Sequence, residues 1–228
     1  MVHITAIFLS AGESKRMGVN KLSLPWGRIT IFEHCLNTLL RSKASEVIVI
    51  LNPRMKELES KVKGQRSRVV INPYYKRGMS TSIRRGVQAI NPNSRGILIA
   101  LGDQPFIKTR TVNALIHAFL QGRGGIIIPS FQARKGHPVL FHRKYEKELL
   151  KLKGDVGGRS IIEKYPDDVW EVPVKSEAVI MDMDTWRDYN PPPTLPSPAG
   201  GEGRRERERF KKRGFRWNRI KNCQKSLC

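Results

Sequence analysis

Residues 4–26 read ITAIFLSAGESKRMGVNKLSLPW. The apolar run at 4–9 has the length of a buried β-strand, and it stops at the small residues Ser10-Ala11-Gly12. Because Gly12 has no Cβ, the backbone can turn tightly there and approach a ligand closely. Arg16 and Lys21 follow in the same loop, and two cations behind backbone N–H groups suit a triphosphate. An ordinary strand-to-helix turn with solvated charges would explain the same residues.

The spacing of this loop differs from two common phosphate-binding motifs. A P-loop needs Gly-Lys-Ser/Thr where a helix opens, and the dinucleotide fingerprint needs Gly-x-Gly-x-x-Gly. The loop instead resembles the nucleotidyltransferase signature L-x-x-G-x-S-x-R-M-G-x-x-K. The matching residues are Leu9, Gly12, Ser14, Arg16, Met17, Gly18 and Lys21.

Strand and helix patterns alternate along the first 189 residues, which predicts an α/β fold with a mostly parallel sheet. We expect strands at 4–9, 46–51, 68–71, 96–101, 126–128, 139–141, 169–172 and 178–181, the later ones including an antiparallel excursion. We expect helices from the capping box at Thr30 to Glu33, at 53–63, 80–89 and 109–121, and from about Ser160.

Composition bounds the class of protein. The chain has 228 residues and a net charge of +22, and such a charge attracts nucleic acid, anionic lipid and small anionic substrates alike. No apolar run reaches the length of a membrane span, and no signal peptide precedes the first strand. We therefore expect a cytoplasmic protein without a membrane partner. The three cysteines show no metal-ligand or disulfide spacing, and Cys35 is expected to be a buried, inert thiol.

The composition changes at Asn190, so we expect a domain at 1–189 and a disordered tail at 190–228. The tail begins with proline and glycine and continues with eleven Lys or Arg residues against three Asp or Glu. Its segment LPSPAGGEG resembles translated interspersed-repeat DNA, which suggests an extension without function. A basic arm with interleaved aromatic residues that binds RNA or DNA is the alternative.

Two acidic segments follow predicted strands. Asp103, in Gly102-Asp103-Gln104-Pro105, lies just beyond the strand at 96–101, where open α/β sheets place their ligands. We expect Asp182 and Asp184 to share one face, because alternate residues of a strand point the same way. Paired carboxylates are costly unless a cation accompanies them. A turn aspartate and solvated strand-end aspartates remain the alternative explanations.

Further motifs extend the resemblance over residues 3–189. They are Asn72-Pro73 with Gly78–Ser82, the L-x-D-Q-P motif at 101–105, Gly136-His137-Pro138-Val139, and the D-x-D-T motif at 182–185. Together with the first loop, they resemble the molybdenum cofactor cytidylyltransferases. The resemblance implies a three-layer Rossmann-like nucleotidyltransferase fold with helices on both faces of the sheet. It also implies transfer of CMP from CTP to the phosphate of the molybdopterin cofactor, with release of pyrophosphate.

The resemblance assigns roles in nucleotide and metal binding. Lys21 would contact the α-phosphate, Arg16 would grip the β- and γ-phosphates, and Asp103 would act with them in catalysis. Mg²⁺ would be bound by Asp103 and Asp184, with Asp182 supporting or sharing the role. The expected nucleotide-binding residues are Leu9, Ser10, Ala11, Gly12, Glu13, Ser14, Arg16, Lys21, Asn72, Ser80, Ser82, Gly102 and Asp103. Asn72 and the serines are also common helix caps.

On the acceptor side, His137 would bind the pterin substrate, and its titration would make the rate sensitive to pH. The loop at 154–159 would help to close over the acceptor, unless it is a plain glycine-rich connector. The expected acceptor-binding residues are Gln104, Pro105, His137, Pro138, Gly157 and Arg159. The product would pass to a molybdenum hydroxylase.

Ala11 stands where related guanylyltransferases carry a second glycine, which favours CTP over GTP. Two alternatives keep the fold: GTP with the same pterin, or CTP or UTP with a sugar or polyol phosphate. A nucleic-acid-binding protein acting through its basic tail is the alternative from another class.

Overall fold

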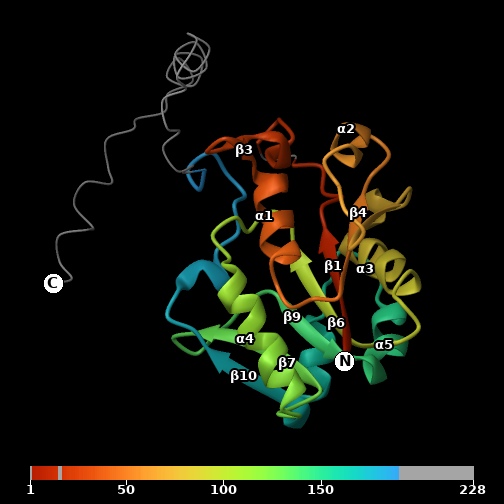
Figure 1. Cartoon of the computed structure of the whole chain (residues 1–228), viewed down its shortest axis with the longest axis vertical. Coiled ribbons are helices and arrows are strands. Elements are labelled where there is room, and N and C mark those ends of the chain that lie inside the picture. Colours follow the sequence, from red (N-terminus) through yellow and green to blue (C-terminus); the bar gives the residue numbers. More distant parts are fainter. Residues whose placement is uncertain (1, 15–16, 190–228) are drawn as a thin grey trace, which may run out of the picture. The chain divides into compact units, whose positions relative to one another are not determined.

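Figure 1 shows a central sheet with helices packed against it, in a computed structural model that describes residues 2–14 and 17–189. The strands of the large sheet are β1 (His3–Leu9), β4 (Glu46–Leu51), β5 (Ser67–Ile71), β6 (Ser94–Leu101), β7 (Ile126–Phe131), β8 (Arg134–Lys135), β9 (Val139–His142) and β10 (Val169–Pro173). A small separate hairpin pairs β2 (Pro25–Trp26) with β3 (Ile29–Thr30).

Six α-helices and several 3₁₀ turns connect the strands of the described residues. The α-helices are α1 (Ile31–Leu40), α2 (Lys56–Glu59), α3 (Met79–Gln88), α4 (Thr109–Leu120), α5 (Glu146–Lys151) and α6 (Arg159–Lys164). The 3₁₀ turns are η1 (Lys21–Ser23), η2 (Tyr75–Arg77), η3 (Arg143–Tyr145), η4 (Pro166–Asp168) and η5 (Glu177–Ile180).

The large sheet is mixed but mostly parallel, as predicted. Its strand order is β10-β7-β9-β6-β1-β4-β5, with β8 paired to β7. β1 runs parallel to β4 and β6, β4 runs parallel to β5, and β10 runs parallel to β7, whereas β9 is antiparallel to both of its neighbours. The parallel strands therefore end at one edge, and β9 begins there because its Val139 pairs with Ile99 near the end of β6.

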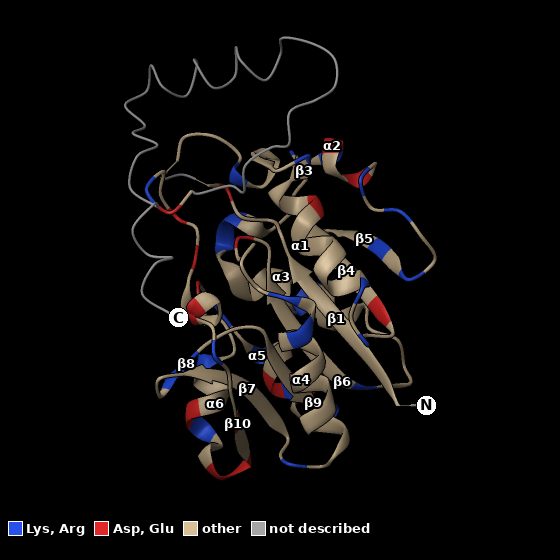
Figure 2. Cartoon of the chain, turned by 60° about the vertical axis from the view of Figure 1, so that its left-hand side comes forward, with Lys and Arg blue, Asp and Glu red and all other residues tan. Residues whose placement is uncertain are grey.

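Successive residues of β1 pack against helices on opposite faces of the sheet. Ile7 lies in a core cluster with Ile83 and Val87 of α3. Phe8 points to the other face, where its ring lies 5.6 Å from the ring of Phe32 on α1. This alternation is what a strand buried on both sides requires, and it confirms the predicted layers of helix, sheet and helix. In Figure 2, β1 carries no charged residue along its length.

The start of α1 confirms the predicted capping box. The Thr30 hydroxyl accepts a hydrogen bond from the Glu33 backbone N–H, and the Glu33 carboxylate accepts one from the Thr30 N–H. Both groups would otherwise be unpaired at the first turn of the helix.

Three predictions of secondary structure were wrong. The helix expected at 53–63 is only the four-residue α2, since Leu58 is its single buried residue. The strand expected at 178–181 is the 3₁₀ turn η5, in which Ala178 and Val179 are buried without strand pairing. β7 continues through Pro129 instead of ending there.

The position of Pro129 explains why β7 tolerates it. β9 pairs with β7 only at 126–127, and β8 pairs with β7 only at 130–131, so Pro129 lies between the two pairings. No ladder hydrogen bond is lost to the missing N–H, while the Pro129 carbonyl still accepts from the Gly136 N–H.

Cys35 is buried at 6% exposure on α1, and burial raises the pKa of its thiol, which confirms the expected inert cysteine. Among the described residues, no helix is both long and apolar enough to cross a bilayer. The predicted tail at 190–228 lies outside the described residues, so the domain boundary stays a prediction.

Candidate active site

Three charged side chains from distant parts of the sequence meet beyond the ends of the parallel strands. The Lys21 Nζ lies 2.6 Å from the Asp103 Oδ2 and 3.0 Å from the Asp184 Oδ1. It also donates to the Met183 carbonyl at 3.0 Å. We call Lys21, Asp103 and Asp184 the ion cluster. The Lys21 side chain is only 12% exposed, so these contacts are partly shielded from water.

Asp103 is positioned by the close approach of two strand ends. Gly102 follows β6, and its N–H donates to the Leu9 carbonyl at the end of β1, at 2.9 Å. A Cβ on Gly102 would lie 3.0 Å from that same carbonyl oxygen, so a larger residue would push the two strand ends apart by a few tenths of an ångström. The neighbouring Asp103 is therefore held at the carboxyl edge of the sheet, as predicted.

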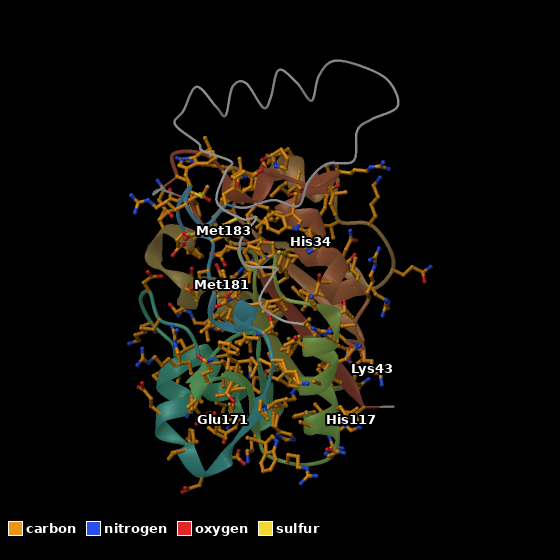
Figure 3. The ribbon with its side chains drawn as sticks, turned by 90° about the vertical axis from the view of Figure 1, so that its left-hand side faces the viewer. His34, Lys43, His117, Glu171, Met181 and Met183 are labelled. Carbon is orange, nitrogen blue, oxygen red and sulfur yellow. The ribbon has the colours of Figure 1, made fainter. Side chains whose placement is uncertain are left out.

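Asp184 reaches the cluster by a different route from the one expected. Residues 181–184 are not a strand, so the argument that Asp182 and Asp184 share a strand face was wrong. Met183 lies between them fully buried, and its N–H donates to the Asp103 carbonyl at 3.1 Å. Figure 3 labels Met183 and Met181 in this segment, far from Glu171 on β10. Burial of Met183 leaves Asp184 beside Lys21, whereas Asp182 contacts Gln104 instead.

The first loop is fastened by its own polar groups. The Ser10 hydroxyl and N–H both donate to the Ile50 carbonyl of β4, and the Ala11 carbonyl accepts from the Asn52 amide. The Ser14 hydroxyl accepts from the Lys21 N–H at 3.1 Å, which holds the backbone that carries the lysine. Ser10, Ala11 and Ser14 therefore stabilise the conformation of the loop through hydrogen bonds within the protein.

Gly12 and Glu13 lie at the top of the same turn. A Cβ placed on Gly12 would meet no heavy atom of the described residues within 4 Å, so among these residues the backbone there is open to an approaching ligand. Glu13 is half-buried beside it. Arg16, the second predicted phosphate-binding cation, lies outside the described residues, so its place relative to the ion cluster stays a prediction.

The charge state of Lys21 follows from its neighbours. Burial by itself would lower the pKa of Lys21, but the charges and hydrogen bonds of Asp103 and Asp184 outweigh it and raise the pKa overall. Lys21 is therefore fully protonated near neutral pH. Its ammonium attracts both carboxylates and so offsets their repulsion of each other.

The carboxylates of the ion cluster fit a divalent cation. The Asp103 and Asp184 oxygens both lie within 3.0 Å of one Nζ atom, so they face a common point. Hard cations such as Mg²⁺ are commonly bound by one or two carboxylates together with water and phosphate oxygens. Within residues 2–14 and 17–189, no group of three or more His, Cys, Asp or Glu side chains forms a fuller set of metal ligands.

Asn72 and its neighbours bond mainly to one another. The Asn72 amide, fully buried, donates to the hydroxyls of Thr81 and Ser82 at 2.9 Å each. Its carbonyl oxygen accepts from the Tyr74 N–H. We call Asn72, Thr81 and Ser82 the amide network. Every polar atom of the Asn72 side chain thus has a protein partner, and the residue fixes the join between β5 and α3.

Ser80 is the exception near this network. Its side chain is fully buried, and its hydroxyl has no hydrogen-bond partner among the described residues. Its N–H donates to the Gly154 carbonyl, and the Met79 N–H donates to the Asp155 carboxylate. The loop predicted to contact the acceptor therefore packs against the start of α3. A Cβ on Gly78 would lie 2.5 Å from the backbone of Gly154, which shows how closely the two loops pack.

The structure separates the two acceptor residues predicted at 157 and 159. Gly157 lies near the α3 start, since a Cβ there would be 3.5 Å from the Met79 sulfur. The Arg159 side chain is 88% exposed and pairs with Glu163 on α6. The Arg159 side chain therefore lies mostly in solvent, and its role at the acceptor stays a prediction.

His137 lies between the two acidic segments. The strand β9 begins just after it at the same edge, and the His137 N–H donates to the Val179 carbonyl. Its ring Nδ1 is buried without a hydrogen-bond partner among the described residues. Burial lowers the pKa of His137, although the nearby carboxylates Asp182 and Asp103 oppose the shift.

Gln104 links this histidine region to the second acidic segment. Its amide donates to the Asp182 carboxylate at 2.8 Å, and its side chain is 4% exposed. Burial and the charge of Asp103 raise the pKa of Asp182, against the hydrogen bond from Gln104. Pro105 and Pro138 are both buried, so they shape the edge of the site.

Sequence reasoning missed two residues that support the first loop and one that supports Asp184. Asn52 donates to the Ala11 carbonyl, and Trp186 donates from its indole N–H to the Met17 carbonyl. Asp188 accepts hydrogen bonds from the backbone of Asp184. The sequence did offer a signal for Asn52. This residue follows β4 directly, and the end of this parallel strand lies at the same edge of the sheet as Asp103. The sequence gives no comparable signal for Trp186, whose partner lies 169 residues away.

Known proteins resemble this chain over most of its length. Molybdenum cofactor cytidylyltransferase from Escherichia coli (strain K12) is 27% identical over 190 residues, which cover 83% of this chain and 95% of that protein. Nicotine blue oxidoreductase from Paenarthrobacter nicotinovorans is 28% identical over 189 residues, covering 80% of this chain and 92% of that protein.

Solved structures resemble the fold. The crystal structure of Rv0371c from Mycobacterium tuberculosis H37Rv matches with a TM-score of 0.74 and 28% identity, covering 82% of this chain and 95% of that one. The same protein in complex with manganese matches with a TM-score of 0.71 and 26% identity, covering 82% and 96%.

The match to a family model spans most of the described chain. The model, described as the MobA-like NTP transferase domain, matches residues 6–169, which include the first loop and Asp103. Nucleotidyltransferases of this kind generally use a divalent metal. The chain belongs to the MobA-like NTP transferase domain family, and it is a nucleotidyltransferase.

Proposed function

We propose that this protein transfers CMP from CTP to the terminal phosphate of the molybdopterin cofactor and releases pyrophosphate. The observation that carries this proposal is the ion cluster, in which one ammonium and two carboxylates face a common point. Such an arrangement suits a metal-bound polyphosphate, because little covalent chemistry falls to the protein in nucleotidyl transfer. The name of the relative from Escherichia coli supports the choice of CTP and molybdopterin.

Asp103 and Asp184 would hold a divalent cation, for which we propose Mg²⁺. When bound, this ion would neutralise phosphate charge and orient the triphosphate. The manganese complex of the Mycobacterium tuberculosis relative supports a divalent cation in this fold. Lys21, which contacts both carboxylates in this structure, would move its ammonium onto the α-phosphate oxygens. Arg16 would grip the β- and γ-phosphates.

Residues around the open backbone at Gly12 would receive the nucleotide. Ser10, Ala11 and Ser14 would act by holding the loop, and the Gly12 N–H would approach the phosphates. Ser80 is fully buried, so its hydroxyl would reach the base or ribose only if the loop at Gly154 moved away from the start of α3. The amide network would set the shape of that pocket, since the polar atoms of Asn72 already have protein partners.

The acceptor would enter from the side of His137. The half-buried His137 ring would make a hydrogen bond to the pterin or its phosphate, and the Gln104–Asp182 pair would lie beside it. A phosphate nucleophile is already ionised at neutral pH, so this chain need not supply a general base. The cofactor product would pass to a molybdenum hydroxylase.

The alternatives of the same fold differ in substrate alone. GTP with the same pterin, or CTP or UTP with a sugar or polyol phosphate, would use the same ion cluster. Ala11 favours CTP, and the motif Gly136–Val139 favours the pterin.

The test is incubation of the protein with each of the four NTPs, Mg²⁺ and molybdopterin cofactor, with pyrophosphate release as the readout. Selective release from CTP, dependent on both the cofactor and the metal, is the expected result. If pyrophosphate is released from GTP alone, the nucleotide substrate is GTP and not CTP. If it is released from CTP only when a sugar phosphate is present, the acceptor is not molybdopterin.

A further inference from the structure

The residues that follow Asp184 make a closed turn around one carboxylate. The Asp188 Oδ2 accepts hydrogen bonds from the Asp184 N–H at 3.2 Å and from the Thr185 N–H at 2.7 Å. The same oxygen accepts from the Thr185 hydroxyl at 2.8 Å. The Asp188 N–H donates back to the Thr185 carbonyl. One side chain therefore fixes the backbone of the turn that carries Asp184.

This turn sets the direction of the Asp184 side chain. On one side of Asp184, the Met183 N–H donates to the Asp103 carbonyl, and the Met183 carbonyl accepts from Lys21. On the other side, the Asp184 N–H is held by Asp188. Because the backbone is restrained on both sides, the Asp184 carboxylate is directed toward the Lys21 Nζ, which the Asp103 carboxylate also contacts.

The turn is also attached to the first loop and to β2. The Trp186 indole donates to the Met17 carbonyl at 3.2 Å, and the Tyr189 hydroxyl donates to the Pro25 carbonyl at 2.6 Å. The rings of Trp186 and Tyr189 contact each other edge to face, 5.9 Å apart. Movement of this turn would therefore separate Asp184 from the loop that carries Lys21.

We propose that Asp188 is a positioning residue that holds the Asp184 carboxylate in place for the divalent cation. This inference rests on the proposed function, in which Asp103 and Asp184 bind the metal. Asp188 acts through the Asp184 backbone and touches neither the substrate nor the ion. A carboxylate suits this role because a single oxygen accepts from two N–H groups and one hydroxyl, all in one turn.

The experiment measures metal binding apart from turnover. Free Mn²⁺ is titrated with the full-length protein in the presence of CTP, and bound metal is quantified from the loss of the free-ion electron paramagnetic resonance signal. Asp188→Ala is expected to weaken Mn²⁺ binding about 10-fold, as is usual when a partner of a metal ligand is removed. Asp188→Asn keeps an amide oxygen that can accept the same hydrogen bonds, and it is expected to recover most of the affinity.

Two further variants separate positioning from damage to the fold. Thr185→Val removes only the hydroxyl that donates to Asp188 and is expected to weaken Mn²⁺ binding about 3-fold. Asp167→Ala makes the same chemical change as Asp188→Ala on the exposed turn η4, which precedes β10 at the opposite edge of the sheet, and should leave binding unchanged. Circular dichroism of each variant reports whether the fold is kept.

The outcomes distinguish this inference from the proposed function. Equal Mn²⁺ affinity for the wild type and Asp188→Ala would overturn the role of Asp188. If the affinity falls but no NTP reacts with molybdopterin, the role of Asp188 stands and the acceptor assignment fails. If the wild type binds no Mn²⁺ with any NTP, the metal assignment and the role of Asp188 both fail.

Discussion

The ion cluster and the amide network lie at the same edge of the sheet but use their polar groups differently. Lys21, Asp103 and Asp184 come from three distant segments, and the ammonium pairs with both carboxylates. In the amide network, Asn72 saturates its hydrogen bonds with a neighbouring helix. The first arrangement can exchange partners with a charged substrate, whereas the second would lose structure by doing so. A position at the predicted site therefore does not by itself distinguish a ligand-binding residue from a structural one. Whether the polar atoms of the side chain already have protein partners is the better criterion.

The largest expected effect comes from breaking the ion cluster at its cation. Lys21→Ala should lower turnover of CTP by about 10²-fold or more, because charge at the α-phosphate would lose its partner. The rate of pyrophosphate release at saturating substrates measures this effect. Circular dichroism should show an intact fold, and Lys21→Arg is the control that keeps the charge. A near-normal rate in Lys21→Ala would remove the lysine from the mechanism.

Neutralising one carboxylate of the cluster should have the next largest effect. Asp103→Asn is expected to raise the Mg²⁺ concentration needed for half-maximal rate by about 10- to 100-fold, because a ligand charge is lost. The dependence of the rate on Mg²⁺ measures it, with Asp167→Asn on η4 as the matched control. An unchanged Mg²⁺ dependence would mean that Asp103 serves only to hold Lys21.

His137, which precedes β9 on the side of β6 away from β5, offers a test of the acceptor side. His137→Gln should raise the KM for the molybdopterin acceptor about 10-fold while leaving the KM for CTP unchanged, because one hydrogen bond to the acceptor is lost. Steady-state kinetics with each substrate varied in turn measures the split. Equal rises in both KM values would contradict a role confined to the acceptor.

The same residue predicts a pH dependence of stability. Since burial lowers the pKa of His137 in the folded state, the unfolded chain takes up the proton first as the pH falls through the ordinary histidine value of 6.5. The neutral ring therefore supports the fold above that pH, and this contribution is lost on acidification. Urea unfolding at about pH 7.5 and about pH 5 should show a smaller loss for His137→Gln than for the wild type. An identical loss would show that other groups control the acid response.

Breaking the amide network should mainly affect stability. Asn72→Ala is expected to reduce the free energy of unfolding by about 1–3 kcal/mol, because it leaves buried hydroxyls with fewer partners. Turnover of the folded protein should change by no more than about 3-fold. Urea unfolding and kinetics on the same preparation measure both quantities. A large rise in the KM for CTP without loss of stability would instead make Asn72 a direct contact of the nucleotide.

The smallest effect is expected from removing residues 190–228. The ion cluster and the amide network both lie within residues 2–14 and 17–189, so turnover of CTP should stay within about 2-fold. Pyrophosphate release by the truncated chain measures this, with the full chain as reference. Loss of RNA or DNA binding on truncation, with turnover retained, would give the tail a separate function. A truncated chain that binds CTP poorly would contradict the boundary at Asn190.

The sequence by itself determined the layers of the fold, since the apolar runs of β1, β4 and β6 are long enough to be buried strands and the helix patterns lie between them. It also determined which charged residues follow those strands. Local sequence patterns predicted the wrong backbone conformation in η5 and in the segment around Met183. In both, apolar residues are buried without the residues pairing in a strand.

Only the tertiary structure decided that Lys21 lies between Asp103 and Asp184, and that Asn72 is occupied while the ring Nδ1 of His137 is buried without a described partner. The physical reason is that periodicity reports which face of an element is buried. It carries no record of hydrogen bonds between atoms that lie 82 or 163 residues apart in the chain.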